Sequence, residues 1–249
     1  MTTTSASDAL VGLPGVRPRL FWALGLGAFG LAFSLAIGLA RVWVQPPRPS
    51  SDSTSHSRLA SRHAPLNRAY GLLAVVGMLD ASTRTAALTF LPFALAGRGV
   101  SPAEVGLLYT VLFAGGAAGK FLCGALGDRF GSLGVVLITE TATALALLGL
   151  VWGPPAAALV LAIVFGFALN GTSSVLYAAV AGLVPEGKRG QGYGLYYTAI
   201  DIAAAAATLA YGLVADHLGL DWTFALIAAV TLAIVPLALP LRQRLAATS

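Results

Sequence analysis

The chain contains 249 residues, of which 57% are hydrophobic and only 10% are charged. A soluble globular protein carries about 25% charged residues, so a soluble fold of this composition would have a largely apolar surface. The net charge of +5 resides in segments between the apolar runs, as in membrane proteins, and does not indicate a nucleic-acid partner. Composition therefore excludes a soluble fold and predicts an integral membrane protein embedded in a lipid bilayer.

Seven apolar segments are long enough to cross a bilayer core of about 30 Å as helices. In chain order these segments cover residues 20–44, 69–96, 103–126, 133–152, 156–184, 191–215 and 221–241. We therefore expect an all-α polytopic membrane protein with about seven transmembrane helices. Residues 1–19 form an N-terminal tail and residues 242–249 a C-terminal tail. The polar stretch 45–68, rich in Pro, Ser and Arg, is expected to be a flexible loop.

The distribution of Lys and Arg predicts how the chain is oriented in the membrane. If residues 45–68 are cytoplasmic, ten basic loop residues lie inside and three lie outside. This bias follows the positive-inside rule. We therefore expect a multi-pass protein of the plasma membrane (the cell membrane), with its N-terminus outside and its C-terminus in the cytoplasm.

Ionised side chains are costly inside a bilayer and therefore mark candidate sites. Asp80 and Arg84 lie four residues apart in the 69–96 segment, so they share one helix face and can form an ion pair. Asp80 is about 17 Å from the cytoplasmic start of the segment, near mid-membrane. One interpretation is a self-neutralised pair that stabilises the bundle. The other is a proton or substrate site, since transporters bind near the midplane.

Three further charged residues fall inside predicted helices. Glu140 and Asp201 are expected about 12 and 15 Å deep, and Lys120 about 9 Å from its inner helix end. Lys120 either extends to the membrane interface or pairs with Glu140 on the adjacent helix. Asp201 has no cationic neighbour within its own segment. It is therefore expected to face a cavity, to pair with Arg84 or Lys120, or to carry a proton.

Two groups of uncharged polar residues complete the set of candidates. Asn170, an amide surrounded by glycines and hydroxyl residues, is either a substrate-contacting break in its helix or an interhelical hydrogen-bond site. Tyr193, Tyr196 and Tyr197 stand near the start of the 191–215 segment. We expect these three tyrosines to anchor the helix at the membrane interface.

The stretch Gly-Ala-Leu-Gly-Asp-Arg-Phe-Gly, residues 124–131, separates two long apolar runs. Its glycines permit a tight turn, and its acid and base favour a polar environment. We expect a short cytoplasmic loop that joins two spanning helices. The residues that define this motif are Gly124, Leu126, Asp128, Arg129 and Gly131.

From about residue 69 to the end, the chain resembles the C-terminal half of a major facilitator superfamily (MFS) transporter. The five motif residues match the family's cytoplasmic loop Gly-x-Leu-Ala-Asp-Arg-x-Gly-Arg-Arg, with Gly127 in place of Ala and Ser132 and Leu133 in place of the final arginines. Residues 184–194 resemble the loop before family helix 11. Residues 211–216, followed by Gly219, resemble the corner between helices 11 and 12.

This resemblance implies that residues 69–241 form a six-helix bundle and that residues 20–44 correspond to family helix 6. The implied function is secondary active transport of a small solute by alternating access, coupled to protons. Asp80, Arg84, Glu140, Asn170 and Asp201 would line the substrate or proton pathway. The 124–131 loop would act as a conformational gate, in which Asp128 meets a helix N-terminus of the opposite half.

The family's first five helices have no counterpart in this sequence, so the resemblance implies a second half-bundle as a partner, either a second copy or a separate chain. The alternative is a truncated, non-transporting membrane subunit or gene fragment that needs a partner half. We expect no enzymatic activity, because no catalytic motif occurs and all three histidines lie in predicted loops. No cofactor is expected, and no spacing of ligands indicates a metal site.

Overall fold

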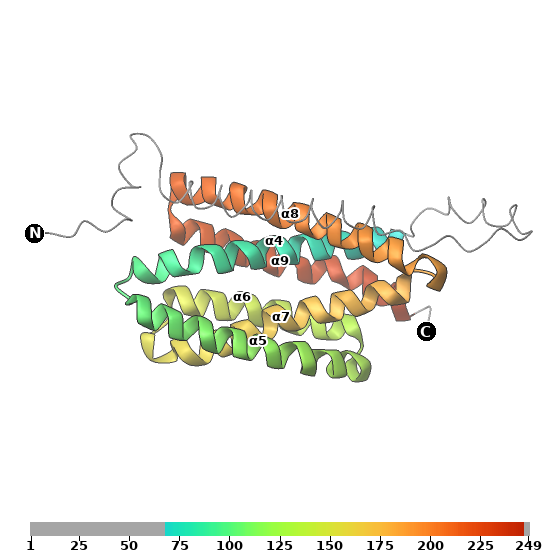
Figure 1. Cartoon of the computed structure of the whole chain (residues 1–249), viewed down its shortest axis with the longest axis horizontal. Helices are drawn as coiled ribbons and strands as arrows, with labels where there is room; N and C mark the ends of the chain where they lie inside the picture. Colours follow the sequence, from blue (N-terminus) through green and yellow to red (C-terminus); the bar gives the residue numbers. More distant parts are fainter. Residues whose placement is uncertain (1–67, 247–249) are drawn as a thin grey trace, which may run out of the picture.

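The computed structural model describes residues 68–246, and within this range the chain is helical apart from short connections. The elements are α4 (Arg68–Ala96), α5 (Pro102–Phe130), α6 (Ser132–Trp152), η1 (Pro155–Ala157), α7 (Ala158–Leu183), η2 (Glu186–Lys188), α8 (Arg189–Leu218) and α9 (Leu220–Ala246). The six α-helices run alongside one another in a bundle (Figure 1). Each of the six is long and apolar enough to cross a membrane.

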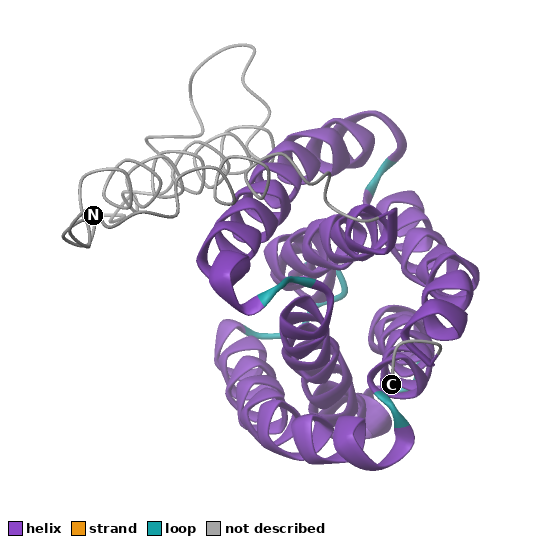
Figure 2. Cartoon of the chain, turned by 90° about the vertical axis from the view of Figure 1, so that its right-hand side faces the viewer, coloured by secondary structure: helices purple, strands orange, loops and turns teal. Residues whose placement is uncertain are grey.

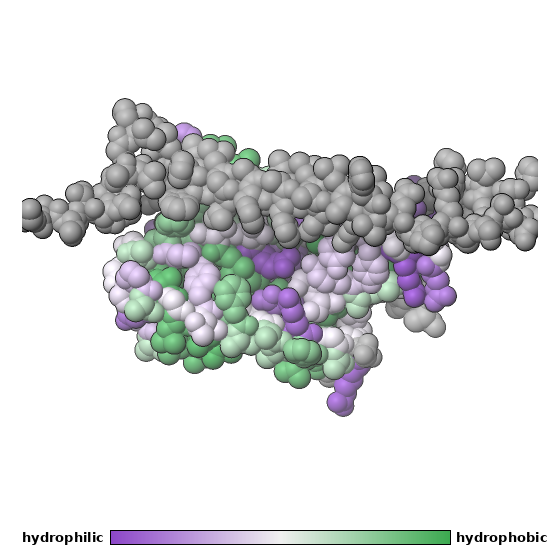
Figure 3. Space-filling model, viewed as in Figure 1, coloured by the Kyte–Doolittle hydropathy of each residue, from purple (hydrophilic) through white to green (hydrophobic). Residues whose placement is uncertain are grey.

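The structure confirms an all-α polytopic membrane protein, and its six helices correspond to the six spans predicted between residues 69 and 241. Figure 2, which looks along the helices, shows that helical ribbon makes up almost all of the described chain. The predicted first span 20–44, most of the loop 45–68 and the tail 1–19 lie outside the described residues. The surface in Figure 3 carries many hydrophobic side chains and a few separate hydrophilic ones, as expected for a bundle in lipid.

Local sequence signals account for where the helices begin and end. Ser101 caps α5 in a capping box: its hydroxyl accepts from the Glu104 backbone N–H, and the Glu104 carboxylate accepts from the Ser101 backbone N–H. The connections after α4, α5 and α8 contain Gly99, Gly131 and Gly219, which have positive φ angles of 83°, 80° and 90°. Glycine adopts this conformation without a steric penalty, so these positions permit abrupt reversals of the chain.

One predicted boundary is wrong. The stretch 124–131 is not a loop, because α5 continues without interruption to Phe130. Gly131 alone joins it to α6, which begins at Ser132. A single residue with positive φ suffices for the turn, so the glycines at 124 and 127 remain helical. Arg129 lies in the last turn of α5, where a cation interacts favourably with the helix dipole.

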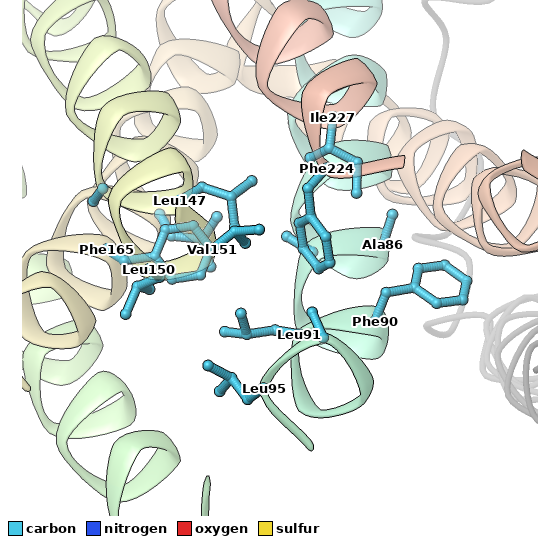
Figure 4. Packing of buried hydrophobic residues seen from close by; sticks show 14 of the residues in the cluster. Ala86, Phe90, Leu91, Leu95, Leu147, Leu150, Val151, Phe165, Phe224 and Ile227 are labelled. Atoms are coloured by element: carbon cyan, nitrogen blue, oxygen red, sulfur yellow. The ribbon is translucent and has the colours of Figure 1, made fainter. Parts of the chain in front are cut away.

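Each helix of the bundle packs closely against particular neighbours. Helix α5 packs mainly against α7, α6 lies between α7 and α9, and α4 contacts α8 and α9. Toward the end of the bundle opposite Gly131, apolar side chains from α4, α6, α7 and α9 gather around Leu91, Leu147 and Phe224 (Figure 4). A second apolar cluster lies toward the other end and includes Leu73, Val136 and Leu176. The buried polar residues described next lie along these packed interfaces.

Candidate functional site

The site begins with an ion pair on α4. Arg84 Nη2 lies 3.6 Å from Asp80 Oδ2, and the two residues are one helical turn apart. The pairing expected from their spacing therefore forms. The two side chains differ in accessibility: 21% of the Arg84 side chain is exposed, but only 6% of the Asp80 side chain. Asp80 consequently forms the inner end of the pair, and Arg84 the outer end.

A second acid approaches from the neighbouring helix. Glu140 on α6 is 1% exposed, and its carboxyl group lies close to the Asp80 carboxyl and the Thr172 hydroxyl. Glu140 Oε1 is buried and has no hydrogen-bond partner among the described residues. Asp80 lies about 18 Å from the start of α4, and Glu140 about 12 Å from the start of α6, so the two acids meet deep in the bundle.

Hydroxyl groups extend the cluster toward α7. Thr172 Oγ1 lies 2.7 Å from Thr139 Oγ1 and also donates to the Ala168 carbonyl at 3.1 Å. Thr139 in turn donates to the Val135 carbonyl at 2.8 Å. Both threonines are buried. Together with Glu140 they form a continuous polar connection between α6 and α7 within an otherwise apolar interface.

Aromatic side chains close the cluster on the α7 and α8 side. The Tyr177 hydroxyl is within hydrogen-bonding reach of the Arg84 guanidinium. The Tyr177 ring packs against Tyr196 and Tyr197 of α8, at centroid separations of 6.0 and 5.1 Å. Tyr196 is only 1% exposed, and a Cβ on Gly77 of α4 would overlap its ring and hydroxyl. Glycine at position 77 therefore permits α8 to bring its tyrosine up to the ion pair.

The expectation that the three tyrosines of α8 anchor the helix at the interface is wrong for Tyr196, which is buried inside the bundle. Tyr193 and Tyr197 are half-buried, and the Tyr193 hydroxyl donates to the Tyr177 carbonyl at 3.0 Å. The reason is the packing of α4 against α8 through glycine, which leaves space for an aromatic ring there.

The other predicted site residues lie at different places. Lys120 is exposed on α5, and among the described residues it forms no ion pair with the buried Glu140. The proposed pairing of these two residues is therefore wrong, because Glu140 faces α4 and α7 instead. Asp201 is half-buried on α8, in the same stretch of helix as Tyr197.

Asn170 does not mark a helix break, because α7 runs continuously from Ala158 to Leu183. Its amide donates to the Gly166 carbonyl at 3.2 Å and lies directly against Gly116 of α5. The glycine at position 116 has room for the amide only because it lacks a side chain. Asn170 thus contributes to the contact between α5 and α7, and its side chain is only partly buried by the described helices.

The motif at the end of α5 is separate from this cluster. Gly124, Leu126 and Arg129 lie in the last two turns of α5, and Arg129 is exposed. The Asp128 side chain lies outside the described part of the structure. The gate assignment of this motif therefore stays a prediction.

The charge balance of the cluster constrains what it can do. Two carboxyl groups, Asp80 and Glu140, share one guanidinium, Arg84, in their immediate surroundings. If all three were ionised, the cluster would carry a net charge of −1 inside an apolar bundle. Such an uncompensated charge is costly in a low-dielectric medium. One bound proton removes it. The arrangement is therefore chemically suited to bind and release a proton.

Three residues of the cluster escaped the sequence-based selection, Thr139, Thr172 and Tyr177, and Tyr196 was selected only as an interfacial anchor. The sequence contains patterns that could have indicated some of these residues. Thr139 and Glu140 stand together in a helix that is otherwise strongly apolar, and Asn170, Ser174 and Tyr177 recur at spacings of four and three residues along one face of α7.

Comparisons with known proteins agree with this architecture. The family model described as Major Facilitator Superfamily matches residues 73–248. Among curated proteins, the "Putative metabolite transport protein YncC" of Bacillus subtilis (strain 168) is 33% identical over 93 residues. These residues make up 37% of this chain and 20% of that relative, so the match spans about a fifth of the relative's length.

Proposed function

We propose that this chain, which belongs to the major facilitator superfamily, moves a small solute across the membrane by alternating access and couples that movement to protons. Membership of this family supports membrane transport and favours it over catalysis. The coupling to protons rests on one observation. Glu140, almost completely buried, meets Asp80 within a cluster that contains a single guanidinium.

The proposed proton site is the carboxyl pair of Asp80 and Glu140. With one proton on the pair, the charges of the cluster sum to zero and the helices can remain tightly packed. Without it, one carboxylate stays uncompensated, and the state of the bundle that admits water becomes relatively more stable. Protonation therefore biases the equilibrium between conformations, as a coupling mechanism requires. Thr172 would hold the Glu140 carboxyl in place for this exchange.

Alternating access needs two bundles that rock against each other around a shared site. The described residues form one six-helix bundle. We therefore propose that a second half-bundle, from another copy of the chain or from a separate chain, completes the transporter. In that assembly Asp128 and Arg129 would act at the gate on the cytoplasmic side, and Asn170 and Asp201 would line the solute pathway. The proposed location is the plasma membrane.

The experiment uses proteoliposomes that contain the full chain and a trapped pH-sensitive dye. Candidate solutes of different charge are added outside, and the proton flux that each one drives is recorded. The decisive variant is Glu140→Gln, which keeps the shape of the side chain but cannot ionise. The matched control is Glu186→Gln, because the Glu186 carboxyl is 87% exposed in η2 and forms its ion pair with Arg189, not with a residue of the cluster.

We expect solute-driven proton flux in the wild type and in Glu186→Gln, and at least a tenfold loss of that flux in Glu140→Gln. We expect a loss of this size because the variant removes a group that must change charge during each transport cycle. Equal proton flux in Glu140→Gln and the wild type would refute the proton site. A chain that stays monomeric in mild detergent and in liposomes, and moves no solute, would favour the non-transporting alternative.

A further inference from the structure

We propose that the solute is an organic anion with a planar apolar part, and that its acidic group binds the Arg84 guanidinium. This inference rests on the proposed transport function and specifies the chemical class of the solute. Three observations carry it: the incomplete pairing of Arg84, its accessibility relative to the two acids, and the tyrosine rings beside it.

Arg84 retains unused capacity to bind an acid. A guanidinium has five N–H donors arranged to hold a carboxylate through two parallel hydrogen bonds. Asp80 does not use this geometry, because its contact with Arg84 is a single N–O approach of 3.6 Å. Arg84 Nε is buried and has no hydrogen-bond partner among the described residues. A ligand oxygen that reaches this edge would satisfy a donor that is otherwise left unpaired.

The positive end of the cluster is the end that a solute can reach. One fifth of the Arg84 side chain is exposed, whereas the Asp80 side chain is 6% exposed and Glu140 is 1% exposed. A solute that approaches this part of the bundle therefore meets a cation before it meets either acid. This order favours an anion and disfavours a cation, which would be repelled by the guanidinium at close range.

Tyrosine rings form an apolar wall beside the guanidinium. Tyr177 contacts Arg84 directly, and its ring centroid is 5.1 Å from that of Tyr197. Tyr193 stacks on Tyr197 at 6.1 Å with an interplanar angle of 24°. These three tyrosines are half-buried, so part of each remains available to a ligand. Aromatic side chains bind planar apolar groups by stacking or edge contacts. The wall therefore selects an anion that carries such a group.

Proton binding and anion binding should reinforce each other at this cluster. One proton on the Asp80–Glu140 pair already balances Arg84, so a bound anion would leave the cluster with an uncompensated negative charge. A second proton, which neutralises Asp80 as well, removes that charge and frees Arg84 from Asp80 to bind the solute. The other ionisable groups on the packed helices include Tyr177 on α7, the exposed Lys120 on α5, and, on α8, Tyr193, Tyr196, Tyr197 and Asp201. Helix α9 contributes none between residues 222 and 240. Linkage then requires that anion binding takes up protons from solution.

The test measures binding to the full chain in phosphatidylcholine nanodiscs. Three probes separate charge from ring: benzoate has both the negative charge and the ring, acetate has the charge alone, and benzylammonium has the ring with a positive charge. Dissociation constants are measured at several pH values, and proton uptake is recorded with an indicator dye. The variants are Arg84→Gln and the double variant Asp80→Asn with Arg84→Gln, which removes both charges of the ion pair. Arg98→Gln, at an exposed ion pair with Asp221, is the matched control.

We expect benzoate to bind at least tenfold more tightly than either other probe, and its affinity to fall by up to tenfold per pH unit as the pH rises. Loss of a charge-assisted hydrogen bond predicts a tenfold or greater weakening in both Arg84 variants, and no change in Arg98→Gln. Benzoate binding no tighter than that of benzylammonium, or unaffected by the double variant, would overturn the proposal. Proton-coupled transport of a cation would overturn the anion class while leaving the proposed function intact.

Discussion

The contact between α5 and α7 makes Gly166→Ala the most informative stability variant of this bundle. A Cβ added to Gly166 would overlap the Leu112 carbonyl oxygen of α5, and it would lie 2.7 Å from the carbonyl carbon and 3.0 Å from the Cα of Leu112. All three neighbours are backbone atoms. No change of side-chain rotamer can therefore relieve the overlap, and the two helices must move apart.

The size of the effect follows from this displacement. Ordinary contacts of a Cβ begin near 3.4 Å, so α5 must shift away from α7 by roughly 1.5 Å to clear the Leu112 carbonyl oxygen. Overpacking of this kind costs about 1–3 kcal/mol, and the rigid backbone places Gly166→Ala at the upper end of that range. The gain in helix propensity from Gly to Ala offsets up to about 1 kcal/mol. We therefore expect a net loss of about 2 kcal/mol in the free energy of unfolding.

The assay is reversible unfolding in mixed detergent micelles, followed by circular dichroism. Gly182→Ala is the matched control, because Gly182 lies on the same helix and a Cβ there would have no neighbour within 4 Å. We expect this control to unfold at the same or slightly higher denaturant concentration than the wild type. If Gly166→Ala proved as stable as Gly182→Ala, the close contact between α5 and α7 would be wrong.

Two further predictions concern single hydrogen bonds that hold the helices in place. Tyr70→Phe removes the 2.7 Å hydrogen bond that the Tyr70 hydroxyl donates to the Gly192 carbonyl. This variant should lower the free energy of unfolding by about 1 kcal/mol in the same assay. An unchanged free energy of unfolding would show that this contact between α4 and α8 contributes nothing to stability. Ser101→Ala removes the cap of α5 that Ser101 shares with Glu104, and should cost about 1 kcal/mol. Faster hydrogen exchange confined to the first turn of α5 would locate that loss, whereas unaltered exchange there would contradict it.

The sequence was sufficient to predict the six membrane-spanning helices that the structure describes, because long apolar runs leave the backbone little alternative in a bilayer. The sequence-based prediction was wrong at the end of α5. There, Gly124 and Gly127 were taken as evidence for a turn, although glycine inside a membrane helix is compatible with continued helical structure. The turn needs only Gly131, whose positive φ reverses the chain in one step. Glycine identity alone does not distinguish these two uses.

The candidate site was predictable where its partners lie on one helix and not where they come from different helices. Asp80 and Arg84 pair as their spacing indicated. Pairing of Glu140 with Lys120 was one of the two alternatives expected for Lys120, but the contacts of Glu140 are with Asp80 and Thr172. The difference depends on how α6 is rotated against α4 and α7. The pattern of residues within one segment carries no information about how that helix is rotated against its neighbours.

The central claim is that the Asp80–Glu140 pair holds a proton inside the bundle. Infrared difference spectroscopy tests this claim directly, through the C=O stretch of a protonated carboxyl group, which an ionised carboxylate does not give. At neutral pH the wild type should show this band, and it should disappear in Glu140→Gln but remain in Glu186→Gln. Absence of the band in the wild type at neutral pH, or its unchanged presence in Glu140→Gln, would contradict the proposed proton site.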